Sequence, residues 1–267
     1  MSSTRIVGIL LVQNEEKYIQ HIIRNILGFC DEIIVADNLS SDSTAEKVKE
    51  LCKEGGKVEY HSVSHPRLSH GLITRYVGTK TWVFGVDGDE LYDPAGLQRM
   101  RRNIMTGHFD DWWMILGNVL HCIDVDFSRE TAHGYLAPPC RSMTKLYNFE
   151  AITSWAGPCP ERLHGGVRQF KDGYAKEMRL ELYKSTSWEE SDFRCLHLCF
   201  QKRSSRDQEV EGIFVRKNIS DMNSEQLFRK IWNSILSVMG KSKMSDWKRN
   251  KYMRGQRVTK NISSFLE

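Results

Sequence analysis

The sequence predicts an α/β fold built on a doubly wound, mostly parallel sheet. Residues 5–13, 32–37 and 81–86 are short, almost uninterrupted runs of aliphatic and aromatic residues, as in strands that are buried on both faces. Segments with apolar residues at helical spacing alternate with these strands, and such an order predicts βαβ units. Polar segments rich in carboxylates and amides follow each run. Together these observations favour a ligand-binding sheet with its site at one edge.

The first expected strand, residues 5–13, leads directly into a helix. Asn14 can cap this helix, in which apolar residues recur at helical spacing over 18–27. Residues 32–37 (EIIVAD) then form a second buried strand that ends in a carboxylate. This stretch therefore predicts the first βαβ unit.

A second helix and two further strands complete the first half of the chain. The helix is expected over about 43–53, where Gly55 and Gly56 end it, and a strand is expected over 58–63. After a loop or short helix at 68–78, the fourth strand covers 81–86. Right-handed crossovers bring the carboxyl ends of parallel strands to one edge of the sheet. The polar segments at 13–16, 37–43 and 87–90 should therefore gather there.

The acidic residues after the fourth strand suggest a metal site. Asp87 and Asp89 flank Gly88, and Glu90 follows. In a continuing strand, residues two apart face the same side, so the two carboxylates would converge and repel each other unless a cation lay between them. Oxygen ligands suit Mg²⁺ or Mn²⁺. The alternative is an acidic turn that only precedes a helix.

The pattern becomes less regular after about residue 108. A helix is expected over 94–106, and residues 121–139 are typical of a long loop or a hairpin. Further apolar runs predict strands, and these cover 112–119, 141–147, 149–155 and 193–200.

The last part of the chain changes character. Residues 224–239 have the spacing of an amphipathic helix, and 241–260 is strongly basic with interleaved aromatic and methionine residues. Such a segment can lie on an anionic membrane, which would give a peripheral contact through 241–260. A solvated tail that packs loosely on the domain is the alternative.

Composition limits the classes that remain. A length of 267 residues suits one large domain or two small ones, and a net charge of +4 is too small to indicate nucleic acid as a partner. The sequence has neither a secretory signal nor a run long enough to span a membrane. Seven cysteines form no disulfide framework. We therefore expect a cytoplasmic protein with reduced thiols.

Three segments in register resemble family-2 glycosyltransferases. They are LLVQNEEKYI at residues 10–19, EIIVADNLSSDST at 32–44 and DGDE at 87–90, and the resemblance covers about the first 95 residues. It implies a GT-A fold, with a catalytic domain over 1–220 and a helical, basic extension over 221–267. Within the domain, 1–108 would bind the nucleotide sugar and 109–220 the acceptor.

The resemblance also implies an activity. It is metal-dependent, inverting transfer of a sugar from a nucleotide-diphosphate sugar, with UDP as the expected nucleotide and Mn²⁺ or Mg²⁺ as the cofactor. The acceptor would be a hydroxyl group of a glycan or of a lipid-linked saccharide.

The resemblance assigns roles to the residues of the three segments. Leu39 departs from the family pattern, which usually has glycine at this position, so the details of the nucleoside contacts depend on that turn. Asp37 would bond the base and Asp42 would lie near it, while Asp87 would face the ribose and the metal. Asp89 would ligate the metal. The nucleotide pocket would be lined by Gln13, Asn14 and Glu16.

The second half offers further candidates. His197 is the expected late metal ligand, and Lys202 and Arg203 would contact the diphosphate; a core histidine is the alternative for His197. An inverting displacement needs a base for the acceptor hydroxyl, and Glu161 lies in the window where the family has one. A structural salt bridge is the alternative for Glu161. The weaker acceptor-side candidates are Trp155, Arg162 and His164.

Two other classes compete with this interpretation. A nucleotidyltransferase also uses paired aspartates, but it usually has a glycine-rich basic loop where this chain has the acidic segment 13–16. A zinc-stabilised, non-catalytic binding module would use His197 and His164 with the thiols of Cys159, Cys195 and Cys199. A family member that has lost activity is a third possibility, which the presence of both aspartates argues against.

Overall fold

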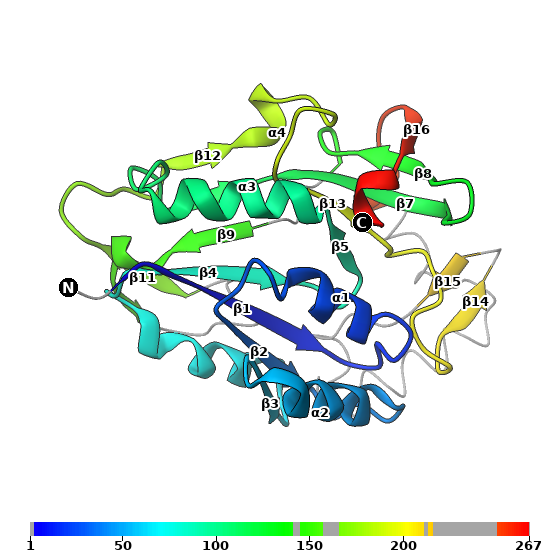
Figure 1. The fold of residues 1–267 in the computed structure, drawn as a ribbon, viewed down its shortest axis with the longest axis horizontal. Helices are drawn as coiled ribbons and strands as arrows, with labels where there is room; N and C mark the ends of the chain where they lie inside the picture. The colour runs from blue at the N-terminus through cyan, green and yellow to red at the C-terminus, as the bar shows by residue number, and fades with distance from the viewer. Residues whose placement is uncertain (1–2, 141–144, 157–165, 211–212, 216–249, 267) are drawn as a thin grey trace, which may run out of the picture.

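A computed structural model describes residues 3–140, 145–156, 166–210, 213–215 and 250–266. In this part of the chain two large sheets lie side by side, and three α-helices cover one of them (Figure 1).

The larger sheet has seven strands in the part of the chain that the structure describes, in the order β12-β6-β9-β4-β1-β2-β3. β1 (Arg5–Val12) lies between β4 (Thr81–Val86) and β2 (Glu32–Asp37) and runs parallel to both. β3 (Val58–Ser62) extends the sheet in parallel beyond β2. The four strands expected in the first half are therefore confirmed, within one residue at their ends.

The strand order shows why the sheet is doubly wound. From β1 to β3 the chain moves in one direction, through α1 (Ile19–Ile26) and α2 (Thr44–Gly55), and it then returns to the other side of β1. A right-handed return must cross the opposite face. This return contains two 3₁₀ helices, at Pro66–Leu72 and Thr74–Tyr76, where a loop or short helix was expected. The winding therefore reverses between β1 and β4.

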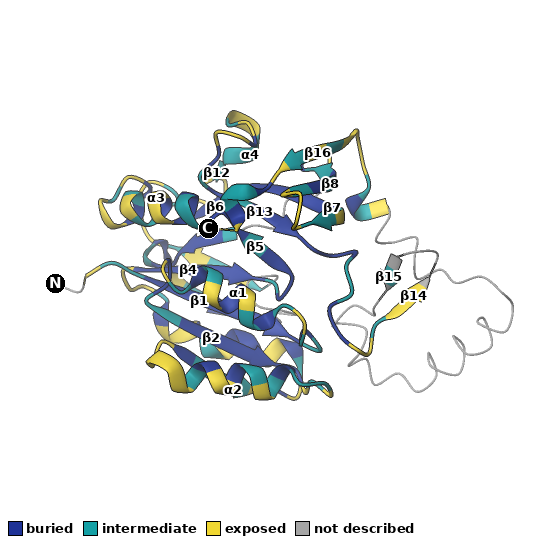
Figure 2. Cartoon of the chain, turned by 45° about the vertical axis from the view of Figure 1, so that its right-hand side comes forward, coloured by how far each residue is buried: buried dark blue, intermediate teal, exposed yellow. Residues whose placement is uncertain are grey.

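The main hydrophobic core lies between the sheet and three helices, of which α3 (Pro94–Met105) is the third. In α1, four isoleucines three or four residues apart are all buried, which is the pattern that predicted the helix. Figure 2 shows β1, β2 and β4 buried, whereas the outward sides of α2 and α3 are exposed. A second core covers the other face of the sheet; it includes Val7, Ile9, Val83, Trp113, Phe149 and Trp155.

The remaining strands of the large sheet only partly follow the expectation. β9 (Lys145–Asn148) runs antiparallel to β4 and to β6 (Met114–Leu116), whereas β12 (Arg179–Glu181) is parallel to β6. Four of the six pairings in this sheet are parallel, so it is mostly parallel. Of the strand expected over 141–147, residues 141–144 lie outside the described residues.

Two expected strands are interrupted. The run 112–119 divides at Gly117 into β6 and β7 (Asn118–Asp126), which belong to different sheets. A Cβ on Gly117 would lie 2.1 Å from the carbonyl oxygen of Phe193, so this close approach of two backbones requires glycine. The run 149–155 begins with a 3₁₀ turn at Phe149–Ala151 and continues as β10 (Ile152–Ala156), which pairs with β11 (Val167–Phe170).

The second sheet has five strands among the described residues, in the order β16-β8-β7-β13-β5. β7 and β8 (Thr131–Leu136) form a hairpin, which settles the choice left open for 121–139. β13 (Arg194–His197) lies between β7 and β5 (Glu90–Tyr92). β5 follows β4 after three residues, so the acidic segment is the junction between the two sheets.

The end of the chain differs from the expected helical extension. β16 (Arg257–Asn261) pairs with β8, and the 3₁₀ turn Ser263–Phe265 stacks its phenylalanine on Trp188, with ring centroids 5.8 Å apart. This end of the chain is therefore part of the domain, because its alternating residues complete the second sheet and its core. The expected helix at 224–239 lies outside the described residues.

Two small elements remain, β14 (Gln208–Val210) with β15 (Ile213–Val215) and the one-turn helix α4 (Leu182–Ser185). Among the helices of the described segments, none is long and apolar enough to cross a membrane.

Candidate functional site

The polar segments that follow β1, β2 and β4 meet at the carboxyl edge of the sheet, toward which the arrows point in Figure 1. The backbone N–H of Asn14 donates to Ser40 Oγ at 2.9 Å, which ties the first segment to the second. Because the winding reverses between β1 and β4, residues 13–16 and 87–90 flank the crevice in which doubly wound sheets bind ligands. The expected gathering of these segments is confirmed.

Asp87 and Asp89 do not continue a strand, contrary to the geometry expected for them. The chain turns after β4, which leaves Asp87 half-buried and Asp89 only 2% exposed. A Cβ on Gly88 would lie 2.7 Å from Cγ of Glu15. Glycine is therefore required here so that the Glu15 side chain can lie across the turn.

Four charged side chains from distant segments meet beside this turn, and all four are buried. Arg203 donates a hydrogen bond from Nη1 to Oδ2 of Asp89, and the same nitrogen lies 3.3 Å from Glu15 Oε1. His197 Nε2 lies 3.5 Å from the same oxygen of Asp89. We call Glu15, Asp89, His197 and Arg203 the charged cluster. Buried charges are expensive unless they are paired, and they are frequent at functional sites.

The members of the charged cluster keep one another ionised. Burial by itself would lower the pKa of His197, but Cys199 and Asp89 raise it to about 10. Burial likewise opposes the charge of Arg203, and Asp89 and Glu15 raise the pKa of its guanidinium. The two carboxylates therefore form a pocket of negative charge that binds cationic groups.

Glu90 is buried and stabilises this turn through hydrogen bonds. Its Oε2 accepts hydrogen bonds from the Tyr92 hydroxyl at 2.7 Å and from the backbone N–H of Asp87 at 3.1 Å. Burial raises the pKa of this carboxyl, although His197 acts against that effect. Glu90 thus fixes the position of the metal-binding candidates before it.

Residues 203–207 connect the charged cluster to the nucleotide-side loops. Ser204 Oγ donates to Asp42 at 2.6 Å, and the N–H of Ser205 donates to Glu16 at 2.6 Å. Donors from Ser205 and Ser43 stabilise the Glu16 carboxylate and lower its pKa to about 2. The two acids therefore anchor the segment that carries Arg203.

A layer of imidazole and thiol groups lies beside the charged cluster. His121 on β7 is in register with His197 on β13, and their Nδ1 atoms are 2.8 Å apart. The ring of Tyr252 packs against both imidazoles, at centroid distances of 4.6 and 5.1 Å. Cys199 completes this layer, which is buried.

A family comparison shows which family the chain belongs to. The model described as "Glycosyl transferase family 2" matches residues 9–165, which are 157 of the 267 residues. The chain belongs to glycosyl transferase family 2. The matched part contains all three motif segments, and the expected enzyme class, a glycosyltransferase, is that of the family. No curated protein matches the chain.

Solved structures similar to this family-2 chain include other glycosyltransferases. One is the mannosyltransferase PcManGT from Pyrobaculum calidifontis in complex with GDP-Man and Mn²⁺, with 17% identity, a TM-score of 0.33 and coverage of 45% of this chain and 36% of that one. Another is glucosyl-3-phosphoglycerate synthase from Mycobacterium tuberculosis with Mn²⁺, UDP-glucose and phosphoglyceric acid, with 17% identity, a TM-score of 0.34 and 44% coverage of both chains. The family-2 chain thus spans less than two thirds of the length of these structures.

The donor set of the charged cluster fits a hard divalent cation. Glu15 and Asp89 offer carboxylate oxygens and His197 an imidazole nitrogen, a combination that suits Mn²⁺ better than a thiophilic metal. Among the residues expected at the metal, the structure brings His197 to Asp89, and Asp87 stands at the start of the same turn. Arg203, expected at the diphosphate, also lies in this family-2 site.

The nucleotide-side candidates lie on the loops at the sheet edge. Gln13 Nε2 donates to the carbonyl oxygen of Asn38 at 2.7 Å. Asp37 is buried and accepts hydrogen bonds from the Tyr60 hydroxyl at 2.9 Å and from the N–H of Ser40 at 3.1 Å. These contacts hold the turn after β2, and they occupy Asp37 within the protein.

Other candidates of the family-2 chain lie elsewhere. Trp155, a weaker acceptor-side candidate, is a core residue: the Arg168 guanidinium lies 4.1 Å from its ring centroid, and His70 packs against it at 4.4 Å. Lys202 lies against the Phe214 ring at 5.8 Å and is not a member of the charged cluster, so its diphosphate role stays a prediction. Glu161, Arg162 and His164 lie outside the described residues.

Two residues of the site escaped the sequence analysis. Glu15 received no role from the sequence, although it lies between two residues assigned to the nucleotide pocket. His121 carried no signal at all, since its contact with His197 depends on the pairing of β7 with β13. Only the register of the second sheet reveals it.

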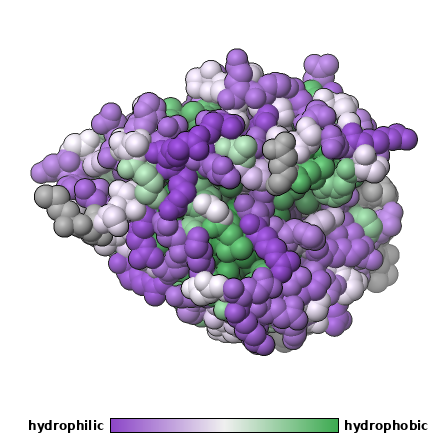
Figure 3. Space-filling model, viewed as in Figure 1, coloured by the Kyte–Doolittle hydropathy of each residue, from purple (hydrophilic) through white to green (hydrophobic). Residues whose placement is uncertain are grey.

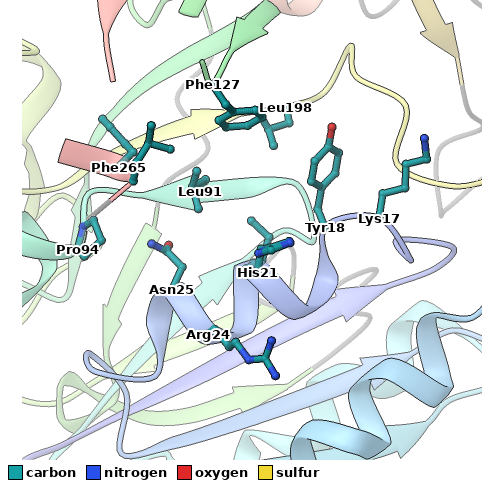
Figure 4. Close-up of a pocket in the computed structure, with 12 residues that line it drawn as sticks. Lys17, Tyr18, His21, Arg24, Asn25, Leu91, Pro94, Phe127, Leu198 and Phe265 are labelled. Carbon is teal, nitrogen blue, oxygen red and sulfur yellow. The ribbon is translucent and has the colours of Figure 1, made fainter. Parts of the chain in front are cut away.

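A separate hollow lies behind the charged cluster. On the face shown in Figure 3, apolar side chains gather in a hollow ringed by hydrophilic ones. The pocket of about 640 Å³ in Figure 4 is lined from α1, β5 and the end of the chain, with Leu91 and Leu198 in its apolar wall. These leucines follow Glu90 and His197 in sequence, so they face the opposite side of the second sheet. The pocket is therefore distinct from the charged cluster.

Proposed function

We propose that this chain catalyses metal-dependent, inverting transfer of a sugar from a nucleotide-diphosphate sugar to a hydroxyl acceptor. The observation that carries the proposal is the buried charged cluster at the reversal point of a family-2 sheet. Such a cluster is a site prepared for a cation and the phosphates that accompany it.

The donor nucleotide, for which UDP is our expectation, would lie over the edge of β1 and β2. Gln13 and Asn14 lie on the first loop, and Asp37 lies at the end of β2, oriented by Tyr60. Asp42 and Glu16 hold the neighbouring segment 203–207 in place. In this proposal all five residues shape the nucleotide pocket, and the segment 203–207 closes it on one side.

Asp87, Asp89 and His197 would hold the divalent cation, Mn²⁺ or Mg²⁺. When bound, such a cation stabilises the negative charge that develops on the departing diphosphate. Without it, Arg203 neutralises Asp89 and Glu15. We infer that Arg203 turns from Asp89 to the diphosphate when the donor binds, with Lys202 as a second cationic contact. There the guanidinium would stabilise the negative charge that develops on the diphosphate as it leaves the sugar.

The acceptor side of the proposal rests on sequence. Glu161 would remove the proton from the attacking hydroxyl group, and Arg162 and His164, which are close to it in sequence, would contact the acceptor. A glycan or a lipid-linked saccharide is the acceptor class we propose. A nucleotidyltransferase is less well supported, since the acidic segment 13–16 offers no cradle for a triphosphate.

The decisive experiment is calorimetric titration of UDP and GDP into the full chain, with and without Mn²⁺. We expect one diphosphate to bind only with the metal, and Asp89→Ala to weaken that binding at least tenfold because a metal ligand is lost. Asp111→Ala, an exposed aspartate after α3, is the matched control and should bind as the wild type does.

Hydrolysis of the matching nucleotide sugar, measured by release of the free diphosphate, extends the test to chemistry. If neither diphosphate binds under any condition, the proposal is wrong. Equal binding by the wild type and Asp89→Ala would place the nucleotide away from the charged cluster.

A further inference from the structure

We propose that His121, His197 and Cys199 form a binding site for one thiophilic divalent cation, with zinc as the expected metal. This site would lie next to the charged cluster but would be separate from the oxygen-rich donor site. Neither the family match nor the proposed transfer reaction requires it.

Burial and convergence carry the proposal. His121 is fully buried, and His197 and Cys199 are no more than 3% exposed. Each residue offers one ligand atom, and the three atoms lie within 4.8 Å of one another. Each of these buried polar groups must have a partner in the interior, and a bound cation would be a common partner for all three.

The distances are close to those of a zinc site. Tetrahedral bonds of about 2.0–2.1 Å to nitrogen and about 2.3 Å to sulfur separate neighbouring ligand atoms by about 3.3–3.6 Å. The two Nδ1 atoms are 2.8 Å apart, so the imidazoles must separate by about half an ångström. Small side-chain rotations achieve this, and the fourth position would fall to a water molecule, as in zinc sites with three protein ligands.

The orientation of His197 keeps the two metal sites apart. Its Nε2 faces Asp89 at 3.5 Å, whereas its Nδ1 faces His121. The side toward Asp89 offers carboxylate oxygens, which suit Mn²⁺ or Mg²⁺, and the side toward Cys199 offers nitrogen and sulfur, which suit Zn²⁺. With zinc on Nδ1, the His197 ring keeps its Nε2 proton, which faces Asp89. The ring binds both metals at once only as an imidazolate that has released both ring protons.

Zinc binding at this site must release protons. A Zn–S bond forms as the Cys199 thiol loses its proton to solvent, and Zn–N bonds form with both Nδ1 atoms. The proton shared in the hydrogen bond between these two atoms is released to solvent, because both Nε2 atoms already carry a proton when His197 is ionised. Zinc affinity should therefore rise with pH, and titrations in buffers of different ionisation enthalpy count the released protons.

The test is titration of the chelator-treated full chain with Zn²⁺, and with Co²⁺ as a spectroscopic reporter. We expect one equivalent to bind and cobalt to show thiolate charge-transfer absorption. Cys199→Ser should abolish that absorption, and Cys199→Ser and His121→Gln should each weaken zinc binding at least tenfold. Cys52→Ser, at a half-buried thiol on α2, is the matched control and should change neither property.

A second measurement does not depend on the folding of any variant. In the wild-type protein, zinc should protect Cys199 from alkylation and leave Cys52 reactive, as read by mass spectrometry. Absence of stoichiometric zinc on the wild type, or charge-transfer absorption that persists in Cys199→Ser, would overturn the site. Asp89→Asn should keep the zinc and lose metal-dependent diphosphate binding, which separates this inference from the proposed function.

Discussion

Leu39 shows at the residue scale how this chain departs from its family. It stands where the family usually has glycine, and its φ is +54°, in the left-handed region that glycine adopts freely. Leu39 is 58% exposed, so packing of its side chain offsets little of the strain of this backbone conformation. The turn after β2 therefore has a leucine in a backbone conformation that favours glycine.

Leu39→Gly should stabilise the protein by about 0.5–1 kcal/mol, because relief of left-handed strain exceeds the added entropy of the unfolded chain. Urea unfolding measures this change. The control is Leu68→Gly, at a leucine 53% exposed in a 3₁₀ helix, where the same exchange should destabilise the fold. Destabilisation by Leu39→Gly would show that the leucine side chain makes contacts that hold the turn.

Glu16 makes the stability of the fold depend on pH in the acid range. Its pKa is lowered from 4.5 to about 2, so the ionised carboxylate stabilises the fold above pH 4.5, and this contribution is lost as the pH falls toward 2. Glu16→Gln should therefore lose less stability than the wild type between pH 6 and pH 3. Denaturant unfolding at the two values tests this.

Glu177→Gln, at an exposed glutamate, is the control for that experiment and should keep the wild-type pH profile. Equal acid sensitivity in Glu16→Gln and the wild type would mean that the contact with Ser205 contributes nothing to stability.

Sequence patterns identified those site residues that lie in local motifs. Asp89 comes shortly after a buried strand, His197 lies within a late apolar run and Arg203 follows that run, so each had a local signal. Glu15 and His121 had none, because their roles arise from packing over Gly88 and from strand register. Trp155 misled for a related reason: an aromatic residue has the same local pattern in a core as in a sugar site.

At the scale of elements, the β7–β8 hairpin depends on Gly134, which lies against the backbone of His121. A Cβ on Gly134 would lie 2.0 Å from the carbonyl oxygen of His121, which is backbone that cannot move aside. Gly134→Ala should destabilise the fold by about 2 kcal/mol or more. Gly28→Ala, at a glycine whose Cβ would meet nothing within 4 Å, should be close to neutral.

Thermal unfolding compares these two glycine variants directly. If both behaved alike, the close approach of β7 and β8 would not contribute to stability. In Gly134→Ala we also expect weaker zinc binding, because a shift of the hairpin moves His121.

The first four strands were predictable because each is a local apolar run in a parallel sheet, with a helix or a polar turn at its end. The second half was not, because its runs divide between two sheets. Residues 114–116 and 118–126 are adjacent in sequence, yet they hydrogen-bond to different partners across Gly117. Apolar pattern alone does not encode which sheet a strand joins.

At the scale of the whole molecule, residues 203–207 return from the second half to complete the site begun by the first. Arg203 reaches Glu15 and Asp89, whose loops lie more than a hundred residues earlier in the chain. The site is therefore a product of the complete fold, and either half alone would lack a member of the charged cluster.

The basic segment 241–260 remains a candidate membrane contact, although 241–249 lies outside the described residues. Removal of everything after residue 240 is an unsuitable test, because β16 would be lost. Exchange of Lys241, Lys243, Lys248 and Arg249 to Gln should lower sedimentation with phosphatidylserine vesicles severalfold, since each charge contributes about 1 kcal/mol to such binding.

The matched control for vesicle binding replaces three lysines on α2, which are Lys47, Lys49 and Lys53, together with Lys57 just after the helix. Equal sedimentation by the wild type and the 241–249 variant would remove the membrane contact from consideration.

The pairing of β16 with β8 has a consequence for synthesis on the ribosome. β8 ends at Leu136, but its outer neighbour begins at Arg257, so more than a hundred residues must be translated before that edge is covered. Until then the nascent chain presents an open strand edge to its surroundings. The first four strands can assemble early, whereas the second sheet is complete only after residues 257–261 have left the exit tunnel. A chaperone that recognises exposed strand edges would therefore bind this chain at its second sheet, after the first four strands have formed.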